Sequence, residues 1–223
     1  MLDNPINQFI EWYKEAKDCK SISLPEAMSL STVDDGFPDA RVMLLKHVDK
    51  KGFVFFTNYQ SSKGKALEKN PNVCMLFFWE KLSRQVRIRG AVEKTQSKFI
   101  VPLLNTVVSA ALKVSGQLRG EKADDDIQSD AYFKTRSRES QIGAWASNQS
   151  QEIENRTILE ANIKKEEDRF KNKEVPRPPH WGGYRLVPTQ IEFWRDKKFR
   201  LHERILYIKN NSNNEWTKKT LSP

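Results

Sequence analysis

The apolar residues near the N-terminus recur with the spacing of one helix face. Between Ile6 and Tyr13 they stand at i, i+3, i+4 and i+7, with Ile10 as the third member. Asn4 followed by Pro5 is a favourable helix start, because the asparagine can cap the helix and the proline suits its first position. The pattern predicts an amphipathic helix from residue 6 to about residue 17.

Short runs of strand-forming residues, separated by turn sequences, follow this helix. Asp34-Asp35-Gly36 and Asp49-Lys50-Lys51-Gly52 are turns of the kind that join antiparallel strands. Predicted strands cover 27–33, 40–48, 53–57, 72–79 and 84–93, and a short helix covers 62–70. Consecutive strands with tight turns favour an antiparallel meander or barrel over a βαβ fold. The chain contains no G-x-G-x-x-G or P-loop sequence, so a nucleotide held in the Rossmann manner is not expected.

The C-terminal part changes from helix to strand patterning. A long charged helix is predicted at 152–171, a proline-rich linker at 175–179, strands from about 183 onwards, and a last hairpin that pairs 206–210 with 216–221. The stretch IEFWRDKKFRLHER, residues 191–204, is interpreted as two strands joined by a charged turn. Period-two alternation on the return strand places Arg200, His202 and Arg204 on one face.

A row of two guanidiniums and an imidazole is typical of a surface that meets an anion. Guanidiniums bind phosphate in bidentate fashion, and a histidine beside them can donate to or accept from a polar substrate group. The alternative is an exposed basic hairpin whose alternation is accidental. On the strand at 84–93, Gln85, Arg87 and Arg89 share a face in the same way, and we interpret the two arginines as surface residues.

Composition narrows the class of protein without deciding the function. The 223 residues suffice for one large domain, and the balance of 38 Lys+Arg against 29 Asp+Glu gives a net charge of +9. Such a charge suits nucleic acid, an anionic surface or small phosphorylated ligands. We expect neither a signal peptide nor a membrane span. Cys19 and Cys74 are too few for a disulfide framework or a metal site, so a reducing cytoplasm fits best.

The 191–204 run also resembles the signature of pyridoxine/pyridoxamine 5'-phosphate oxidase, a family of FMN enzymes. That signature reads aliphatic, Glu, aromatic, Trp, a spacer, and then Arg-Leu-His-acid-Arg. Glu192, Trp194, Arg200, His202 and Arg204 fall in place at the right spacing. The resemblance implies that Arg200 and His202 are the catalytic residues, at the reacting end of the substrate.

Other segments resemble the FMN-binding motifs of the same family. RVMLLK at 41–46 is similar to the segment whose basic ends and backbone hold the flavin, and a strand-end bend is needed if both ends are to serve one ligand. The cofactor contacts implied by the resemblance are Arg41, Val42, Met43, Leu44, Leu45, Lys46, Phe56, Thr57, Ser62, Lys63, Gln85, Gln149, Ser150, Trp194 and Arg204. Ser62 departs from the arginine that the family commonly has there.

The stretch AYFKTRSRESQIGAWASNQS, residues 131–150, resembles the family's clamp on the substrate phosphate. Tyr132, Arg136 and Ser140 match the clamp, and Lys46 joins them. Hydroxyls and a guanidinium are the groups that a phosphate dianion binds. Between the two regions of resemblance, 99–128 is interpreted as an insertion with no chemistry of its own.

The resemblance implies a mainly β fold, an FMN-binding split barrel with flanking α-helices, spanning 1–223 as one domain. It further implies a homodimer whose C-terminal segment, about 181–223, serves dimerisation and the active site. The implied reaction oxidises pyridoxamine or pyridoxine 5'-phosphate to pyridoxal 5'-phosphate, with molecular oxygen reduced to hydrogen peroxide. No nucleic acid or membrane is expected as a partner.

Two rival functions remain open from the sequence. A related split-barrel flavin oxidase of phenazine pathways would share the FMN residues but lack the phosphate clamp. A non-enzymatic basic β-barrel that binds single-stranded nucleic acid would need aromatic residues exposed among the basic ones. Phe53, Phe55, Phe77 and Phe78 are instead interpreted as core residues, which argues against the second rival.

Overall fold

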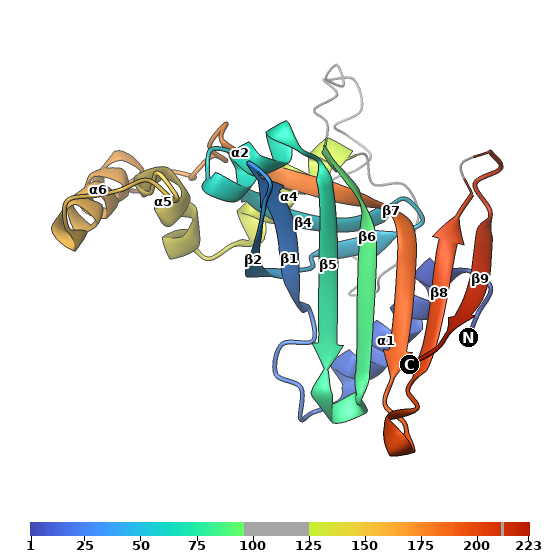
Figure 1. Cartoon of the computed structure of the whole chain (residues 1–223). Helices are drawn as coiled ribbons and strands as arrows, with labels where there is room; N and C mark the ends of the chain where they lie inside the picture. Colours follow the sequence, from blue (N-terminus) through green and yellow to red (C-terminus); the bar gives the residue numbers. More distant parts are fainter. Residues whose placement is uncertain (96–124, 211) are drawn as a thin grey trace, which may run out of the picture.

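A computed structural model describes residues 1–95, 125–210 and 212–223. In this part of the chain, nine strands form one antiparallel sheet with helices around it (Figure 1). The strands are β1 Ala27–Asp34, β2 Phe37–Leu44, β3 His47–Asp49, β4 Gly52–Asn58, β5 Asn72–Trp79, β6 Arg84–Lys94, β7 Trp181–Arg195, β8 Glu203–Lys209 and β9 Trp216–Leu221. The helices are α1 Pro5–Asp18, α2 Ser62–Lys69, α4 Asp125–Thr135, α5 Arg138–Ala146 and α6 Arg156–Arg169, with short 3-10 turns η1 Glu80–Leu82 and η2 Lys198–Arg200. None of the described helices is long and apolar enough to cross a membrane.

The sheet closes on itself through two residues. Its strand order is β2-β1-β5-β6-β7-β4-β3, so β2 and β3 lie at opposite ends of the path. Only Leu45 and Lys46 separate them in sequence. The Leu45 N–H donates to Glu26 O at 2.9 Å, and the Lys46 N–H donates to Val54 O at 2.9 Å, so the chain passes from β1 to β4 at this point. The predicted mainly β antiparallel barrel with flanking helices is confirmed.

Most predicted elements occur at their predicted positions, and the differences have local causes. The strand predicted at 40–48 is two strands, because the chain leaves β1 at Leu45 to join β4. The charged helix predicted at 152–171 begins later, at Arg156, where the Asn155 side chain accepts the N–H of Thr157 at 3.0 Å. The predicted insertion at 99–128 lies outside the described residues except for its last four, which begin α4.

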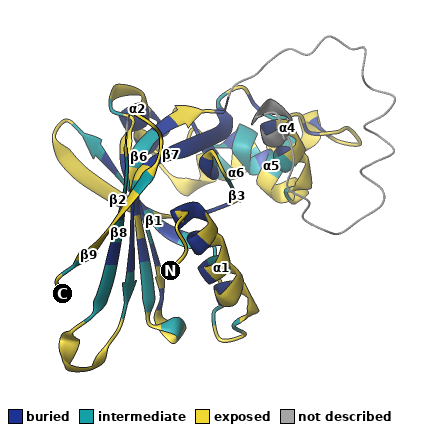
Figure 2. Ribbon diagram, turned by 90° about the vertical axis from the view of Figure 1, so that its right-hand side faces the viewer, coloured by how far each residue is buried: buried dark blue, intermediate teal, exposed yellow. Residues whose placement is uncertain are grey.

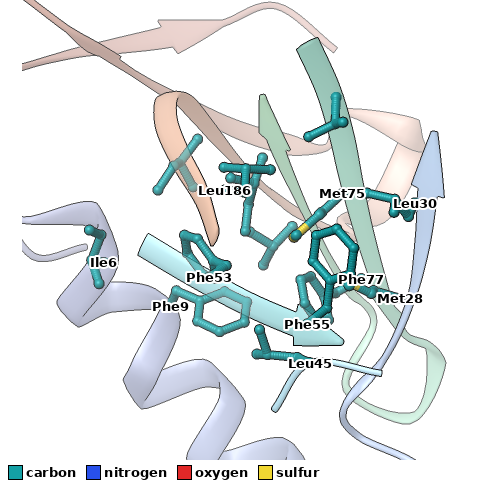
Figure 3. Close-up of a cluster of buried hydrophobic side chains, with 14 of the residues drawn as sticks. Ile6, Phe9, Met28, Leu30, Leu45, Phe53, Phe55, Met75, Phe77 and Leu186 are labelled. Atoms are coloured by element: carbon teal, nitrogen blue, oxygen red, sulfur yellow. The ribbon is translucent and has the colours of Figure 1, made fainter. Parts of the chain in front are cut away.

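The main hydrophobic core lies between α1 and the sheet (Figure 3). Asn4 caps α1 by accepting the N–H groups of Ile6 and Asn7, as its sequence predicts. Phe9 is fully buried and meets Phe53 edge to face, with ring centroids 4.9 Å apart. Burying a side chain of this size contributes roughly 1.5–3 kcal/mol.

The inward face of α1 differs from the predicted one by one position. Ile10, expected on the apolar face, is 40% exposed, whereas Trp12 is buried and packs edge to face on Phe193 of β7. The buried apolar residues of α1 are Ile6, Phe9, Trp12 and Ala16, at i, i+3, i+6 and i+10, which is a face turned by part of a helical turn from the predicted one. Figure 2 shows the buried side of α1 turned towards the strands.

A second, smaller core joins the later helices to the start of β7. Its buried members are Phe133, Ile142, Phe170, Val175 and Trp181. They come from α4, α5, the end of α6 and the linker that follows it. α5 and α6 pack against each other beyond the sheet, on the side where α2 stands (Figure 1). This cluster therefore anchors the 125–180 region to the first residue of β7.

A charged cluster around the buried Arg185 connects β3 to β7 across β4. Arg185 is fully buried, and its Nη1 donates to Asp49 Oδ1 at 2.6 Å. His47 Nε2 lies 3.3 Å from the other carboxylate oxygen, and the Lys51 N–H also donates to Asp49. Burial alone would raise the pKa of Asp49, but hydrogen bonds from His47 and Lys51 and the Arg185 charge hold it well below its ordinary value.

β7 is the longest strand and bends where it meets Gly90 of β6. The register between the two strands shifts at Arg89/Gly90, and Gly90 then stands opposite Pro188. A Cβ added at Gly90 would lie 2.0 Å from Val187 O. The close backbone approach at this β-bulge is thus compatible only with glycine.

Gly90→Ala should therefore destabilise the protein by about 2–3 kcal/mol, because the backbone of β7 must shift to admit the methyl group. The matched control is Gly143→Ala in α5, where nothing lies within 4 Å of the added Cβ. That change should stabilise the protein by about 0.5–1 kcal/mol through helix propensity. Urea unfolding of both variants measures the difference, and equal effects would contradict the assigned role of the bulge.

Candidate active site

A cavity of about 310 Å³ lies where β2 and β4 end and α2 begins. The segment that closes the barrel forms one wall, since Val42, Met43, Leu44 and Lys46 all line it. The remaining lining residues are Phe56, Thr57, Asn58, Lys63, Tyr132, Arg136, Gln149 and Trp181. Ten of these twelve are predicted site residues, brought together from five separate segments of the chain.

The cavity is cationic. Lys46, Lys63 and Arg136 line it, and no carboxylate is found among its described lining residues. The Lys63 side chain is only 8% exposed, and its Nζ donates to Ser61 Oγ at 3.3 Å and to Gln149 Oε1 at 3.5 Å. Burial, and secondly the nearby Arg41 charge, lower the pKa of Lys63. Such an arrangement fits an anionic ligand, because its negative charge would replace the water that the Lys63 ammonium group loses on burial.

Arg136 is held by aromatic rings. Its guanidinium carbon lies 4.8 Å from the centre of the Trp181 ring and 5.4 Å from that of Phe133. Its Nη1 is buried and has no hydrogen-bond partner within the described ranges. Burial lowers the pKa of this guanidinium, with Tyr132 acting in the opposite direction. A buried cationic donor without an acceptor is costly, so the site is suited to a ligand oxygen at this position.

Four other predicted residues form a second group, which we call the Trp194 group. Gln85, Trp194 and Arg204 are cross-strand neighbours on β6, β7 and β8. The fourth member is His202, whose ring centroid lies 4.7 Å from that of Trp194. Asp196 Oδ1 lies 2.9 Å from His202 Nδ1, which fixes the orientation of the imidazole.

The two groups lie at opposite ends of one strand. Trp181 and Trp194 are thirteen residues apart along β7, which corresponds to about 40 Å of strand path. Trp181 lines the cavity, whereas no residue of the Trp194 group does so. A single chain therefore presents the predicted site as two separate parts.

Glu192 orients the Trp194 group from below the surface. Its side chain is 5% exposed, and its Oε1 accepts from Arg204 Nε at 3.0 Å and Nη2 at 2.9 Å. The other carboxylate oxygen pairs with Arg87, which is exposed as predicted but has an ion-pair partner that its sequence did not predict. The reason is that Arg87 and Glu192 are directly opposed in the β6–β7 register. Arg204 also donates to the backbone oxygen of Ser222 at 3.1 Å.

Arg200 is not on a strand. The predicted alternation fails because β8 begins only at Glu203, and Arg200 lies in the turn η2 with a left-handed backbone (φ 61°). It is exposed and separate from the row formed by Trp194 and Arg204. Its catalytic role stays a prediction.

Five further predicted residues neither line the cavity nor belong to the Trp194 group. Arg41 donates to Leu30 O and Thr32 Oγ1 and pairs with Asp39, so it reaches the cavity only through its charge on Lys63. Leu45 is a buried member of the main core, and Ser62, Ser140 and Ser150 are exposed. Roles for these residues as ligand contacts remain predictions.

Asn58 and Trp181 line the cavity without having been predicted. Trp181 lies directly before Gly182-Gly183, at the point where the C-terminal strands were expected to begin. The two glycines allow other groups to approach the backbone closely. An aromatic residue directly before them is therefore a sequence signal from which Trp181 could have been predicted as a site residue. Phe78, predicted to be core, is 58% exposed, because alternation on β5 turns Phe77 inwards and Phe78 outwards.

Comparison with known proteins identifies the family. A profile described as "Pyridoxamine 5'-phosphate oxidase" matches residues 14–170, and one described as "Pyridoxine 5'-phosphate oxidase C-terminal dimerisation region" matches residues 181–223. The chain belongs to the pyridoxamine 5'-phosphate oxidase family. The relationship predicted from the 191–204 motif is thereby confirmed.

Curated members of the pyridoxamine 5'-phosphate oxidase family match over nearly the whole chain. A protein of Azorhizobium caulinodans named "Pyridoxine/pyridoxamine 5'-phosphate oxidase" is 43% identical over 222 residues, covering 99% of this chain and 91% of the relative. A protein of the same name from Paraburkholderia phytofirmans is 44% identical over 221 residues, covering 99% and 89%.

Solved structures agree with the split-barrel fold of this family. PhzG from Burkholderia lata 383, in complex with tetrahydrophenazine-1-carboxylic acid, superposes with a TM-score of 0.80 at 26% identity, covering 100% of this chain and 94% of the other. A pyridoxamine 5'-phosphate oxidase-related, FMN-binding protein from Nostoc punctiforme has a TM-score of 0.68 at 16% identity, with both chains covered fully. The second match shows the fold alone.

Glu192→Gln should lower the free energy of unfolding by about 2 kcal/mol. The substitution removes the negative charge that neutralises Arg87 and Arg204. Breaking a fully buried ion pair would cost more, but both arginines are partly exposed, so water screens part of their charge. Glu203→Gln is the matched control, since Glu203 also faces two cations but at 3.8 and 3.9 Å and with 36% exposure. That control should change stability by less than about 0.5 kcal/mol. Chemical denaturation of both variants checks the expectation, and equal losses would contradict it.

Proposed function

We propose that this protein is an FMN-dependent oxidase that converts pyridoxamine 5'-phosphate and pyridoxine 5'-phosphate to pyridoxal 5'-phosphate. Oxygen is reduced to hydrogen peroxide, and the amine substrate releases its nitrogen as ammonia. The observation that carries the proposal is that Lys46, Tyr132 and Arg136 share one cavity with Lys63 and Gln149. Two curated relatives at 43% and 44% identity bear the name of this activity.

The cavity offers binding groups for two phosphates. Lys46, Tyr132 and Arg136 would hold the phosphate of the substrate, because a lysine, a phenol and a guanidinium can all donate to it. Lys63 stands in the first turn of α2, where the backbone N–H groups of a helix favour an anion. This second position would hold the phosphate of FMN, with Thr57 and Gln149 beside it.

FMN, when bound, supplies the hydride acceptor and then the electron donor to oxygen. The residues of the chain bind and orient. Gln85, Trp194 and Arg204 would contact the flavin, and Glu192 keeps the Arg204 side chain in place. His202, whose Nδ1 lies beside Asp196, would present its other nitrogen to the substrate.

A homodimer completes the site in this proposal. One chain carries the cavity and the Trp194 group at different ends of β7, so a second copy is needed to bring one of each together. Three members of the Trp194 group lie within residues 181–223, which match the dimerisation region. Val42 and Phe78 are 73% and 58% exposed in the single chain, and a partner that covers them would remove this apolar surface from water.

A reducing cytoplasm is part of the proposal. It rests on the unpaired state of both cysteines, Cys19 and Cys74.

The phenazine-type oxidation is a second candidate, favoured by the similarity to PhzG at 26% identity. The cationic end of the cavity argues for the phosphorylated pyridine. Among the described residues no carboxylate pairs with Lys46 or Arg136, so a phosphate dianion would supply the negative charge that the two cations lack. Turnover assays of the FMN-loaded protein with both B6 phosphates and with tetrahydrophenazine-1-carboxylic acid decide between the two. Turnover of the phenazine acid alone would overturn the proposal.

Arg136→Ala should raise KM by about one to two decades and leave kcat close to wild type. The phosphate that it binds does not change during oxidation, so the lost charged hydrogen bond affects ground and transition states alike. His202→Ala should instead lower kcat at saturating substrate, because the imidazole would lie at the reacting end. Steady-state kinetics with flavin content measured on each variant is the test. The opposite pattern would mean that the two ends of the substrate are reversed.

Mixing these two variants tests the shared site. If each site combines the cavity of one chain with the Trp194 group of the other, a heterodimer of Arg136→Ala and His202→Ala chains contains one intact site. Co-expression with two different tags and purification of the heterodimer should then give about half the kcat/KM of the wild-type dimer, measured well below the wild-type KM, where both parent variants are slow. Activity no higher than that of the parent variants would place both groups of one site on the same chain.

A further inference from the structure

Trp181 is fixed at the cavity end of β7 by contacts on every side. It is 8% exposed, and its ring lies parallel to that of Phe56, with centroids 5.4 Å apart and planes inclined by 5°. Phe133 meets it edge on at 5.1 Å. Its backbone is also held, because the Trp181 N–H donates to Pro178 O at 3.1 Å and its carbonyl accepts from Arg177 Nη1 at 2.7 Å.

The Arg136 guanidinium lies over the face of the Trp181 ring. The guanidinium carbon lies 4.8 Å from the ring centre, and no carboxylate in the described part of the chain pairs with Arg136. The same aromatic stack extends to Tyr132, whose ring lies 4.4 Å from Phe56 and holds Lys46 Nζ at 5.6 Å. Two of the three cavity cations are therefore placed by aromatic faces.

An aromatic face positions a guanidinium differently from a carboxylate. A carboxylate would occupy the N–H edge and cancel the charge, whereas a ring attracts the flat face and leaves the N–H groups available. Arg136 Nη1 is buried and has no partner among the described residues, as expected for a donor kept available in this way. The tryptophan thus sets the direction of the guanidinium without competing for its donors.

We infer that Trp181 is a positioning residue that holds the Arg136 guanidinium ready for the phosphate group of the ligand. The inference rests on the proposed function for the identity of that ligand. It assigns Trp181 a part in phosphate recognition and none in contact with the reacting carbon.

The test compares Trp181→Leu with Trp181→Phe in the FMN-loaded protein. Binding of pyridoxal 5'-phosphate and of unphosphorylated pyridoxal is measured by absorbance, so that their ratio isolates the phosphate end. Trp181→Leu should weaken binding of the phosphorylated compound about tenfold and leave pyridoxal binding within about twofold. Trp181→Phe retains a face for the guanidinium and should stay within about threefold of wild type. In turnover, Trp181→Leu should raise KM and leave kcat unchanged.

Trp145→Leu is the matched control. Trp145 packs against the same small core and carries an arginine, Arg169, at 4.7 Å from its ring, but it does not line the cavity. Its removal should leave the ratio of the two affinities unchanged. An equal loss in Trp145→Leu, or an equal loss of both ligands in Trp181→Leu, would reduce Trp181 to a structural residue and overturn the inference.

A double-mutant cycle gives a second, independent reading. In an Arg136→Ala background, Trp181→Leu should cost no further affinity for the phosphate, and a full additional loss would also overturn the inference. Trp181→Met, whose longer and more flexible side chain can adapt to the space left by the indole, replaces Trp181→Leu if the latter does not fold. A wild-type protein that binds pyridoxal 5'-phosphate through Arg136 but oxidises neither B6 phosphate would refute the proposed function and leave this inference standing.

Discussion

The structure depends on the pairing of β7 with three other strands. Along its length β7 hydrogen-bonds to β4, β6 and β8, and its register with β6 shifts by one residue opposite Gly90. Every backbone group of such a strand must find a partner, so β7 fixes where the neighbouring strands lie. Its first residue, Trp181, lines the cavity, and near its last residue Trp194 pairs with Gln85 of β6 and Arg204 of β8. One bent strand therefore sets the geometry of both parts of the site (Figure 1).

Cationic side chains of the described residues are held in two ways. Arg185 and Arg204 pair with Asp49 and Glu192, and these pairs hold strands together. The cavity cations have no carboxylate of that kind within the described residues, and Arg136 rests on an aromatic ring instead. A paired arginine has its charge cancelled within the fold, whereas an arginine on a ring keeps its charge for a ligand. The contrast separates arginines that stabilise the fold from an arginine that can bind a ligand, and it needs no comparison with related proteins.

The barrel closure and the cavity are one feature. Lys46 lies in the two-residue connection between β2 and β3, the two ends of the sheet path, and it lines the cavity. The connection leaves the edge strand β2 and joins the other edge strand, β3. Its side chains therefore cannot follow the alternation between the two faces of the sheet that holds within each strand. That departure from strand geometry is what brings Lys46 to the cavity, with its Nζ 5.6 Å from the centre of the Tyr132 ring.

The sequence by itself determined the strands, the N-terminal helix, the antiparallel class and the family, because turn sequences, period-two alternation and the 191–204 motif are local signals. It also identified ten of the cavity's lining residues through their resemblance to known motifs. Only the tertiary structure decided that Trp181 belongs to the site, that Arg87 and Glu192 pair, and that Arg200 leaves the strand. These facts follow from register, bending and packing between segments far apart in the chain. No local pattern encodes them, since each depends on which residue of one strand faces which residue of another.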